Sequence, residues 1–331
     1  MTVFRTLCYY TIDFNLTGGL FLRDLYCIGE MLIDFIPGTE TGSYVRNAGG
    51  APANVAIAAA RQGLRSAMCC SLGDDNFGRF LLDTLEKNGV EAIKKTLCRE
   101  AVTTMAFVTL DEKGDRSFTF ARKPGADMLL NENDVKEEEI AESVIVHAGS
   151  LSLSASPAAE ATRRALRLAH EKGRFVSFDV NYRDLIWNGD IKACTDAVCS
   201  CLRYVDVMKI SEEEAGMFGG EAAVGELMTR FGLSAVVETL GAAGARCFYN
   251  GASFEVPGRK AVCVDATGAG DAFWGGFLSA LRLGGLEKPS DLSEELLHDA
   301  LEYGNRCGWF CVQKKGAISA LPTREEVEGL R

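Results

Sequence analysis

Histidine is scarce in this chain, and the cysteines lack the spacing of zinc ligands. The chain has only three histidines in 331 residues, and its 12 cysteines include no Cys-x-x-Cys pair, which argues against the usual spacings of zinc ligands. Disulfide frameworks are typical of small secreted domains, whereas a chain of this length can bury a full core without them. We therefore expect most of the thiols to be small buried side chains of a protein in the reducing cytoplasm.

Other absences narrow the range of partners. Basic residues number 35 against 46 acidic ones, so the net charge is -11, whereas a nucleic-acid partner requires a basic face. No apolar run is long enough to cross a membrane. The sequence also has neither the G-x-x-x-x-G-K-[ST] run of P-loop enzymes nor a G-x-G-x-x-G run behind a strand. We expect no nucleic-acid partner, no membrane partner and neither of these two nucleotide-binding folds.

What the chain does contain is an alternation of strand and helix patterns from Leu25 to its end. Continuous apolar runs, such as LYCIGEMLIDF at residues 25–35, are typical of buried strands in a parallel sheet. The alternation predicts one α/β domain over residues 25–331, with a central, mostly parallel sheet and helices on both faces. We interpret residues 1–24, which do not fit this pattern, as a loosely attached N-terminal extension, with an extra edge strand as the alternative.

Residues 262–283, VCVDATGAGDAFWGGFLSALRL, form the most informative stretch. A β-branched run, a glycine loop and apolar residues repeated every four positions predict a strand over residues 262–265, a tight turn and a helix. The backbone N–H groups of Gly268, Ala269 and Gly270 would then lie at a helix N-terminus. Unpaired donors and the helix dipole make such a place a natural anion site.

Asp271 stands in the first turn of this predicted helix. A carboxylate there can simply be a helix-start residue that the dipole stabilises. Together with the glycine loop and Asp265, it favours a chemical role, in which the loop holds a phosphate and the carboxylate takes a proton beside it.

Two segments resemble the signatures of a known family. DATGAGD, followed by an apolar helix, resembles the C-terminal signature of the ribokinase-like (PfkB) sugar kinases. RNAGGAPANVAIAAARQG, at residues 46–63, resembles their N-terminal signature. The second segment taken alone could be a glycine turn before a close-packed helix. Two signatures in the right order are far more specific than either one.

The resemblance implies a ribokinase-like fold and roles for particular residues. In that family the final Asp of the signature activates the sugar hydroxyl as a base, and the glycine loop is the anion hole for the transferring phosphoryl group. The catalytic residues that this implies are Asp271, Gly268, Ala269 and Gly270, and the sugar contacts nearer the N-terminus are Asp34, Gly50 and Asn54. Asp265 would lie near the monovalent cation site that many members have.

A predicted hairpin interrupts the α/β pattern. The runs at residues 102–110 and 116–122 flank a short polar turn, which is typical of paired antiparallel strands. The hairpin could simply be an edge of the sheet. In the family it is part of a lid over the sugar, so the resemblance implies lid strands near residues 37–47 and 98–124, a sugar contact for Arg122 and a homodimer formed through the lid.

Polar residues also follow a predicted strand at residues 174–180. Arg183 is a candidate sugar contact there, because ligands bind beyond the carboxyl ends of parallel strands, although loop packing is the simpler alternative. The segment DVNYRDLIW around it resembles both fructokinases and 2-keto-3-deoxygluconate kinases.

The resemblance also implies which residues bind the nucleotide, and these lie in the C-terminal half of the chain. Ser211 and Glu214 form a capping box at a predicted helix start, which needs no further role. The family often has Asn-x-x-Glu here, with the Glu holding Mg²⁺ and phosphates through water; Glu214 is therefore a candidate, whereas Ser211 departs from the pattern. The other candidates for nucleotide binding are Lys209, Thr239, Gly241, Gly244 and Asn305.

These features predict an ATP-dependent carbohydrate kinase, and GEMLIDFIP at residues 29–37 is most similar to the fructokinase branch. The expected reaction is phosphorylation of fructose to fructose 6-phosphate, with ATP, Mg²⁺ and a monovalent cation such as K⁺ as cofactors. The alternatives are a 2-keto-3-deoxygluconate kinase, a nucleoside kinase and a non-catalytic sugar-sensing homologue. The intact Gly268, Gly270 and Asp271 argue against the last of these.

Overall fold

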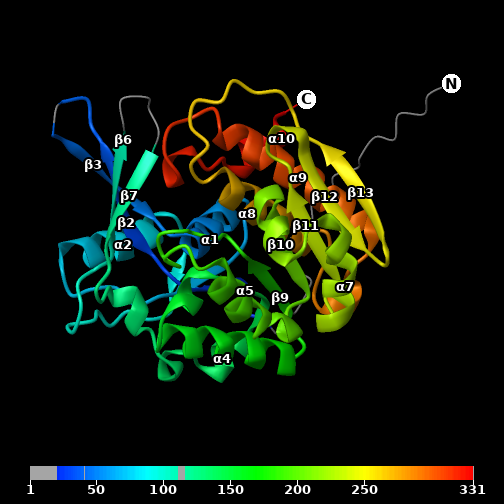
Figure 1. Cartoon of the computed structure of the whole chain (residues 1–331), viewed down its shortest axis with the longest axis horizontal. Helices are drawn as coiled ribbons and strands as arrows, with labels where there is room; N and C mark the ends of the chain where they lie inside the picture. Colours follow the sequence, from blue (N-terminus) through cyan, green and yellow to red (C-terminus); the bar gives the residue numbers. More distant parts are fainter. Residues whose placement is uncertain (1–20, 41, 111–115, 331) are drawn as a thin grey trace.

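The computed structural model describes residues 21–40, 42–110 and 116–330 (Figure 1). Residues 1–20 of the predicted extension and the polar turn of the predicted hairpin, residues 111–115, lie outside the described residues. Within the described part of the chain, no helix combines the length and the apolar character that a membrane crossing requires.

A nine-stranded sheet runs through the molecule in the order β13-β12-β11-β10-β9-β8-β1-β4-β5. Each neighbouring pair from β11 to β5 is parallel, while β12 and β13 at one edge run antiparallel, which confirms the predicted mostly parallel sheet. Its strands are β1 (Arg23–Ile28), β4 (Ser66–Cys69), β5 (Glu91–Ala92), β8 (Ser143–Gly149), β9 (Phe175–Asp179), β10 (Val207–Ser211), β11 (Ala235–Thr239), β12 (Gly244–Tyr249) and β13 (Ala252–Pro257).

Helices cover both faces of this sheet, as predicted, and each face has its own core. Side chains alternate along β1, so Leu25 and Cys27 belong to one core while Tyr26 and Ile28 belong to the other. The first core includes α1, α2, α8 and α9, and the second includes α4, α5 and α7. The helices are α1 (Ala51–Arg61), α2 (Asn76–Lys87), α3 (Glu137–Ala141), α4 (Ala158–Glu171), α5 (Ile191–Cys199), α6 (Glu212–Ala215), α7 (Glu221–Phe231), α8 (Ala269–Leu283), α9 (Glu294–Cys311) and α10 (Arg324–Glu328).

A second, small sheet of four strands stands beside the main one, in the order β3-β2-β6-β7, at the left of Figure 1. The strands β6 and β7 pair antiparallel, so the predicted hairpin is confirmed. The small sheet consists of β2 (Leu32–Pro37), β3 (Tyr44–Gly49), β6 (Met105–Leu110) and β7 (Arg116–Ala121).

The apolar run at residues 25–35 was predicted as a single strand, and this prediction is wrong. The run divides at Gly29, whose φ of 148° lies in the region that favours glycine. The part before Gly29 is β1 of the main sheet, and the part from Leu32 onward is β2 of the small sheet. Hydrophobicity does not reveal the break, because residues on both sides of it are buried.

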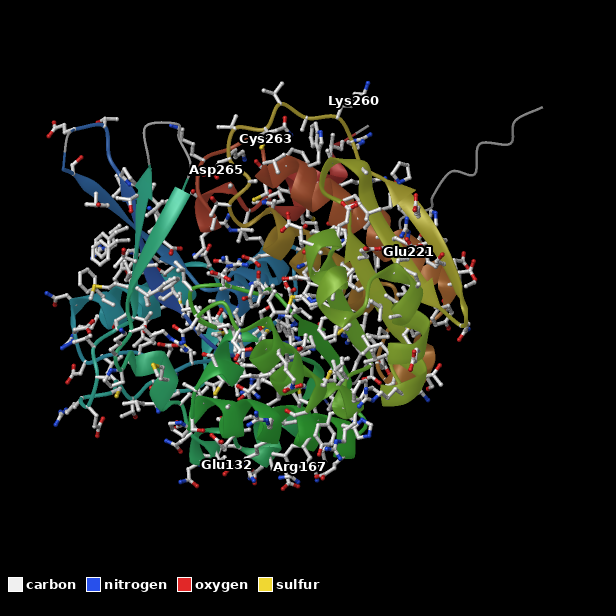
Figure 2. The ribbon with its side chains drawn as sticks, in the orientation of Figure 1. Glu132, Arg167, Glu221, Lys260, Cys263 and Asp265 are labelled. Carbon is white, nitrogen blue, oxygen red and sulfur yellow. The ribbon has the colours of Figure 1, made fainter. Side chains whose placement is uncertain are left out.

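The strand predicted over residues 262–265 is also wrong. These residues form a loop that Figure 2 shows from Lys260 through Cys263 to Asp265, and Val262 is 81% exposed. The backbone N–H groups of Val264 and Asp265 donate to a carbonyl oxygen just past the end of α9 rather than to a strand. Tertiary context therefore overrides the β propensity of the valines.

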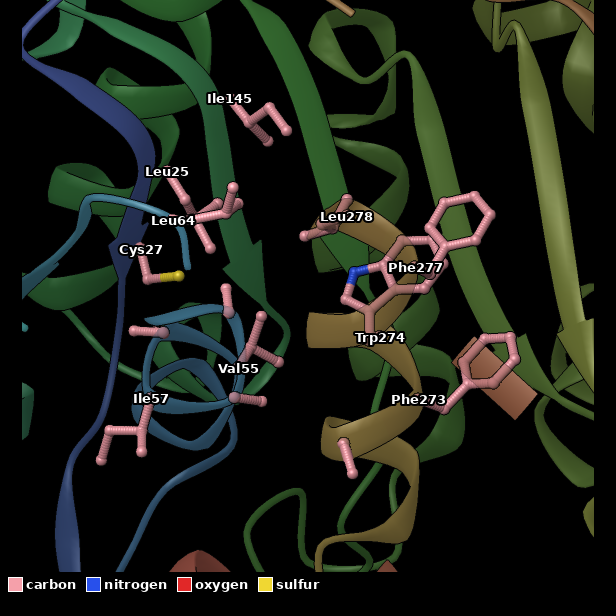
Figure 3. Close-up of a cluster of buried hydrophobic side chains, with 14 of the residues drawn as sticks. Leu25, Cys27, Val55, Ile57, Leu64, Ile145, Phe273, Trp274, Phe277 and Leu278 are labelled. Atoms are coloured by element: carbon pink, nitrogen blue, oxygen red, sulfur yellow. The ribbon is translucent and has the colours of Figure 1, made fainter. Parts of the chain in front are cut away.

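Helix α8 packs against α1 within the first core (Figure 3). Trp274 of α8 is fully buried, and its Nε1–H donates to Ser177 Oγ of β9 at 3.0 Å. Ser177 Oγ also lies 3.0 Å from His147 Nδ1 of β8. These buried hydrogen bonds hold α8 against two strands of the main sheet, and so they also hold the first turn of the helix, which carries Asp271.

Candidate active site

The residues of the two sequence signatures meet at the N-terminal end of α8. Asn54, in the first turns of α1, donates from Nδ2 to Asp271 Oδ2 at 2.7 Å, although the two residues are 217 positions apart. Lys209 near the end of β10 faces the same turn, since a Cβ on Gly270 would lie 3.6 Å from Lys209 Nζ. The site therefore lies at the carboxyl ends of the parallel strands, where open sheets of this kind bind their ligands.

The glycine loop has the geometry of an anion-binding helix start. Gly268 is the N-cap residue, with φ of 76°, and a Cβ on it would lie 3.0 Å from Ala317 Cα, so the position requires glycine. Among the described side chains, none caps the helix, and its first amides remain for a ligand. Ala269 differs from its neighbours, because its N–H donates to Ala266 O at 3.2 Å within the turn.

Asp271 has the properties of a proton acceptor. Its side chain is almost fully buried, and burial raises the pKa of its carboxyl. The hydrogen bond from Asn54 and the charge of Lys209 act in the opposite direction, while the negative charge of Asp179 raises the pKa further. A carboxylate with a raised pKa takes up a proton more readily than an ordinary Asp, which suits a general base.

Two of the predicted sugar residues share this region with Asp271. Burial raises the pKa of Asp34 to about 6, and the charges of Arg183 and Asp271 act on it with opposite signs. Arg183 is exposed, with its Nη1 donating to a backbone carbonyl at 2.9 Å. The structure thus brings Asp34, Arg183 and Asn54 within electrostatic or hydrogen-bonding range of the candidate base.

A buried ion pair between Lys209 and Asp179 was not predicted from the sequence. Lys209 Nζ lies 2.8 Å from Asp179 Oδ2, and the two side chains are 7% and 2% exposed. Burial opposes the charge of Lys209, but Asp179, Glu214 and Asp271 together raise its pKa above the usual value. The signal available in the sequence was that both residues stand near the ends of predicted strands. The structure makes these strands, β9 and β10, neighbours and pairs the two residues in register.

Glu214 forms the predicted capping box at the start of α6. Its Oε2 accepts the N–H of Ser211 at 2.9 Å, and its Oε1 accepts the N–H of Tyr182 at 2.6 Å. Burial and the charge of Asp179 raise the pKa of Glu214, while Lys209 lowers it. The carboxylate is therefore fixed beside the Lys209–Asp179 pair.

The carboxylates of Asp179 and Glu214 fit a hydrated Mg²⁺. Asp179 Oδ1 is buried without a hydrogen-bond partner among the described residues, and each Glu214 oxygen keeps an acceptor position beyond its backbone bond. Across the described ranges, no group of three or more His, Cys, Asp or Glu side chains is arranged to hold a metal directly. Mg²⁺ often keeps several waters and binds through one or two carboxylates and substrate phosphates, which matches this donor set.

The four predicted nucleotide residues downstream of Glu214 lie around the β11–β12 turn and on α9. Gly244 has φ of 110°, and a side chain there would overlap the backbone of β13, so the turn requires glycine. Asn305 donates from Nδ2 to Val256 O at 3.0 Å, which fastens the end of β13 to α9. The remaining two are Thr239, at the end of β11, and Gly241, with φ of 56°.

Asp265 joins the glycine loop to the loop that follows α9. Its Oδ1 accepts the N–H of Thr267 at 3.0 Å, and its Oδ2 accepts the N–H of Gly316 at 3.0 Å. The predicted monovalent cation would lie near this junction. Hard cations take oxygen ligands, and Asp265 would supply a carboxylate close to such a cation.

Arg122 is enclosed at the base of the small sheet. Its side chain is 7% exposed, with Nε donating to Asp127 Oδ2 at 2.8 Å and Nη1 donating to Ser154 Oγ at 3.1 Å. Its Nη2 is buried without a hydrogen-bond partner among the described residues, so the guanidinium keeps donors for a ligand. That contact stays a prediction.

Comparison with known proteins identifies the family. The model of the pfkB family of carbohydrate kinases matches residues 22–324. This chain belongs to that family. Fructokinase-1 of Oryza sativa subsp. japonica is 39% identical to this pfkB kinase over 310 residues, which cover 90% of the chain and 94% of the rice protein.

Solved structures of fructokinases share the fold of this pfkB kinase. The fructokinase of Xylella fastidiosa with bound ATP has a TM-score of 0.83 and 32% identity, and the match covers 93% of this chain and 97% of that one. A double mutant of the fructokinase of Vibrio cholerae O395, bound to fructose, ADP and potassium ion, has a TM-score of 0.81 and 33% identity, with the same two coverages. The ribokinase-like fold and the carbohydrate kinase activity predicted from the two signatures are confirmed.

Gly50→Ala is expected to lower the free energy of unfolding by about 1–3 kcal/mol. Gly50 has φ of 108°, and a Cβ on it would lie 2.6 Å from Glu30 O, so the variant combines backbone strain with a clash. Urea unfolding followed by circular dichroism measures the effect. Gly251→Ala is the matched control, since its φ of 77° brings strain without any atom within 4 Å of the new Cβ. Equal losses in the two variants would show that the clash plays no part.

Proposed function

We propose that this pfkB kinase is an ATP-dependent fructokinase that converts fructose to fructose 6-phosphate. The observation that carries the proposal is the buried Asp271 carboxylate, held by Asn54 at the N-terminus of α8 beside a glycine loop without a side-chain cap. The choice of fructose is supported by the similarity to fructokinases over 90% of the chain or more.

In the proposed mechanism, Asp271 accepts the proton of the sugar hydroxyl whose oxygen attacks the γ-phosphorus of ATP. The N–H groups of Gly268 and Gly270 donate to the oxygens of the moving phosphoryl group, while Ala269 closes the turn between them through its bond to Ala266 O. Lys209 adds positive charge beside the loop. Asp34, Asn54 and Arg183 orient the sugar hydroxyls. Positioning and electrostatic stabilisation thus account for most of the catalysis.

The proposed cofactors follow from the carboxylates around this site. When bound, Mg²⁺ would neutralise part of the charge of the ATP phosphates. Glu214 and Asp179 would accept hydrogen bonds from its waters, and Asp265 would stand beside a monovalent cation such as K⁺. Gly241, Gly244, Thr239 and Asn305 would line the nucleotide.

The small sheet is proposed as a lid that also forms a homodimer. Tyr44 and Val45 on β3 are 43% and 55% exposed, which leaves apolar surface on an edge strand of this sheet. Sedimentation of the purified protein would test for the dimer. A cytoplasmic location is supported by the cysteines of the described residues, all of which are free thiols.

A panel of acceptors tests the substrate. We expect kcat/KM to be highest for fructose when ADP release is measured with fructose, 2-keto-3-deoxygluconate, ribose and adenosine, because the sequence is most similar to fructokinases. Phosphorus NMR of the product should show a phosphate ester on the 6-hydroxyl. A preference for 2-keto-3-deoxygluconate would show that this compound, and not fructose, is the substrate. The absence of turnover with every acceptor would favour a sugar-sensing role.

A further inference from the structure

Glu30 is a buried carboxylate that the proposed mechanism does not use. It lies in the short link between β1 of the main sheet and β2 of the small sheet, and it is 2% exposed. Its Oε1 accepts the N–H of Ala51 at 3.1 Å, whereas its Oε2 has no hydrogen-bond partner among the residues that the structure describes. Burying a carboxylate with one oxygen unbonded is unfavourable, so its position needs an explanation.

On one side, Glu30 anchors the end of α1 that carries Asn54. The N-cap residue of α1, Gly50, offers no side-chain acceptor, and Glu30 supplies the acceptor and the negative charge from another element. Asn54 follows within the first turns and donates to Asp271 at 2.7 Å. Any shift of the N-terminus of α1 would therefore move the hydrogen-bond donor of the candidate base.

On its other side, Glu30 leads directly into β2 of the small sheet, which begins two residues later. Asp127 Oδ2 lies 2.7 Å from an Nη of Arg122, which follows β7, and Asp127 Oδ1 accepts the hydroxyl of Thr104, which precedes β6. Asp127 thereby joins both ends of the β6–β7 hairpin. The charges of Asp127 and Arg122 also act on Glu30, and all three side chains are buried.

We propose that Glu30 is a positioning residue of the kinase: it links the base of the small sheet to the N-terminus of α1 and so holds Asn54 and Asp271 in their catalytic arrangement. This inference rests on the proposed function. In this role Glu30 acts through α1, because its Oε1 is bonded to the Ala51 N–H.

The strength of this link depends on the charge of Glu30. Burial raises the pKa of Glu30 to about 7, with Asp127 raising it and Arg122 lowering it. The thiol of Cys70, which also interacts with Asp127 and Glu30, has its pKa raised well above the usual range by burial and stays neutral. Above pH 7 the ionised carboxylate attracts the positive end of α1, and below pH 7 protonation removes that attraction.

The test compares the wild type with Glu30→Gln, which keeps an oxygen for the Ala51 N–H and removes the charge. We expect the ratio of wild-type to variant kcat/KM for fructose to be close to one at about pH 5.5 and to rise through pH 7 to roughly tenfold at about pH 8.5. Glu30 is not among the charges that act on Asp271, so its loss changes the titration of Asp271 only through the position of Asn54. The KM for ATP should stay the same, because the nucleotide residues lie on other elements.

Glu139→Gln on α3 is the matched control, since Glu139 also has a pKa raised by burial and an unbonded Oε2 but lies outside the site. The ratio of wild-type to Glu139→Gln kcat/KM should stay at one over the whole pH range. A Glu30→Gln ratio that does not change with pH would overturn the inference and leave the fructokinase proposal standing. A wild type inactive on fructose would instead overturn the proposed function.

A second variant covers the case in which Glu30→Gln does not fold, which circular dichroism would reveal. Asp127→Asn removes the charge that raises the pKa of Glu30, so the rise of kcat/KM with pH should move to lower pH. Asp127 is not among the charges that act on Asp271, so this shift reports on Glu30. An unmoved profile in a folded Asp127→Asn protein would overturn the inference.

Discussion

Asp271→Asn should lower kcat by roughly 10²- to 10⁴-fold, the usual contribution of a positioned general base. The amide keeps the size of the carboxylate and can still bond to Asn54 after rotation, so the local packing is retained. It cannot accept the proton of the sugar hydroxyl. The KM for fructose should therefore change far less than kcat, and steady-state kinetics with both substrates measures the two effects separately.

The pH dependence of kcat tests the same assignment in the unaltered protein. Asp271 must be ionised to accept a proton, and burial raises its pKa, so kcat should rise with pH from mildly acidic values as Asp271 loses its proton. Asp299→Asn on α9 is the control for the substitution, since Asp299 also has a raised pKa but its side chain is exposed. Turnover of Asp271→Asn close to that of this control would remove Asp271 from the role of base.

Lys209→Met should lower the free energy of unfolding by about 3–5 kcal/mol, the usual effect of breaking a buried ion pair. Methionine fills much of the space of the lysine stem but leaves Asp179, at 2% side-chain exposure, without its cation. Urea unfolding followed by circular dichroism measures the loss. In the double variant Asp179→Asn, Lys209→Met, the loss should be smaller, because no buried charge is left without a partner.

A surface pair offers the matched comparison. Lys192 and Asp196 lie 2.5 Å apart on α5 with side chains 82% and 66% exposed, and Lys192→Met should lower the free energy of unfolding far less than Lys209→Met. Lys209→Met should also move the rise of kcat to higher pH, because Lys209 lowers the pKa of Asp271. Equal stability losses in the two lysine variants would show that the Lys209–Asp179 pair is not the buried support that its geometry indicates.

Elements with a strong local pattern could be predicted from the sequence. The helix after the glycine loop, the hairpin at β6 and β7 and the capping box of Ser211 and Glu214 depend on residues close together in the chain, and the structure confirms all three. The two strand predictions that the structure contradicts both fell on segments with the amino-acid composition of strands. One is divided at Gly29, and the other, at residues 262–265, bonds to the end of α9 instead of a sheet.

The sequence by itself determined the α/β class, the glycine loop before α8 and the family, because these depend on local periodicity, on turn chemistry and on short signatures. Only the tertiary structure decided that Asn54 bonds to Asp271, that Asp179 pairs with Lys209 and that Glu30 stands between the small sheet and α1. Each of these contacts joins residues from separate elements. Their partners, burial and pKa values are set by the packing of those elements, and spacing along the chain does not encode that packing.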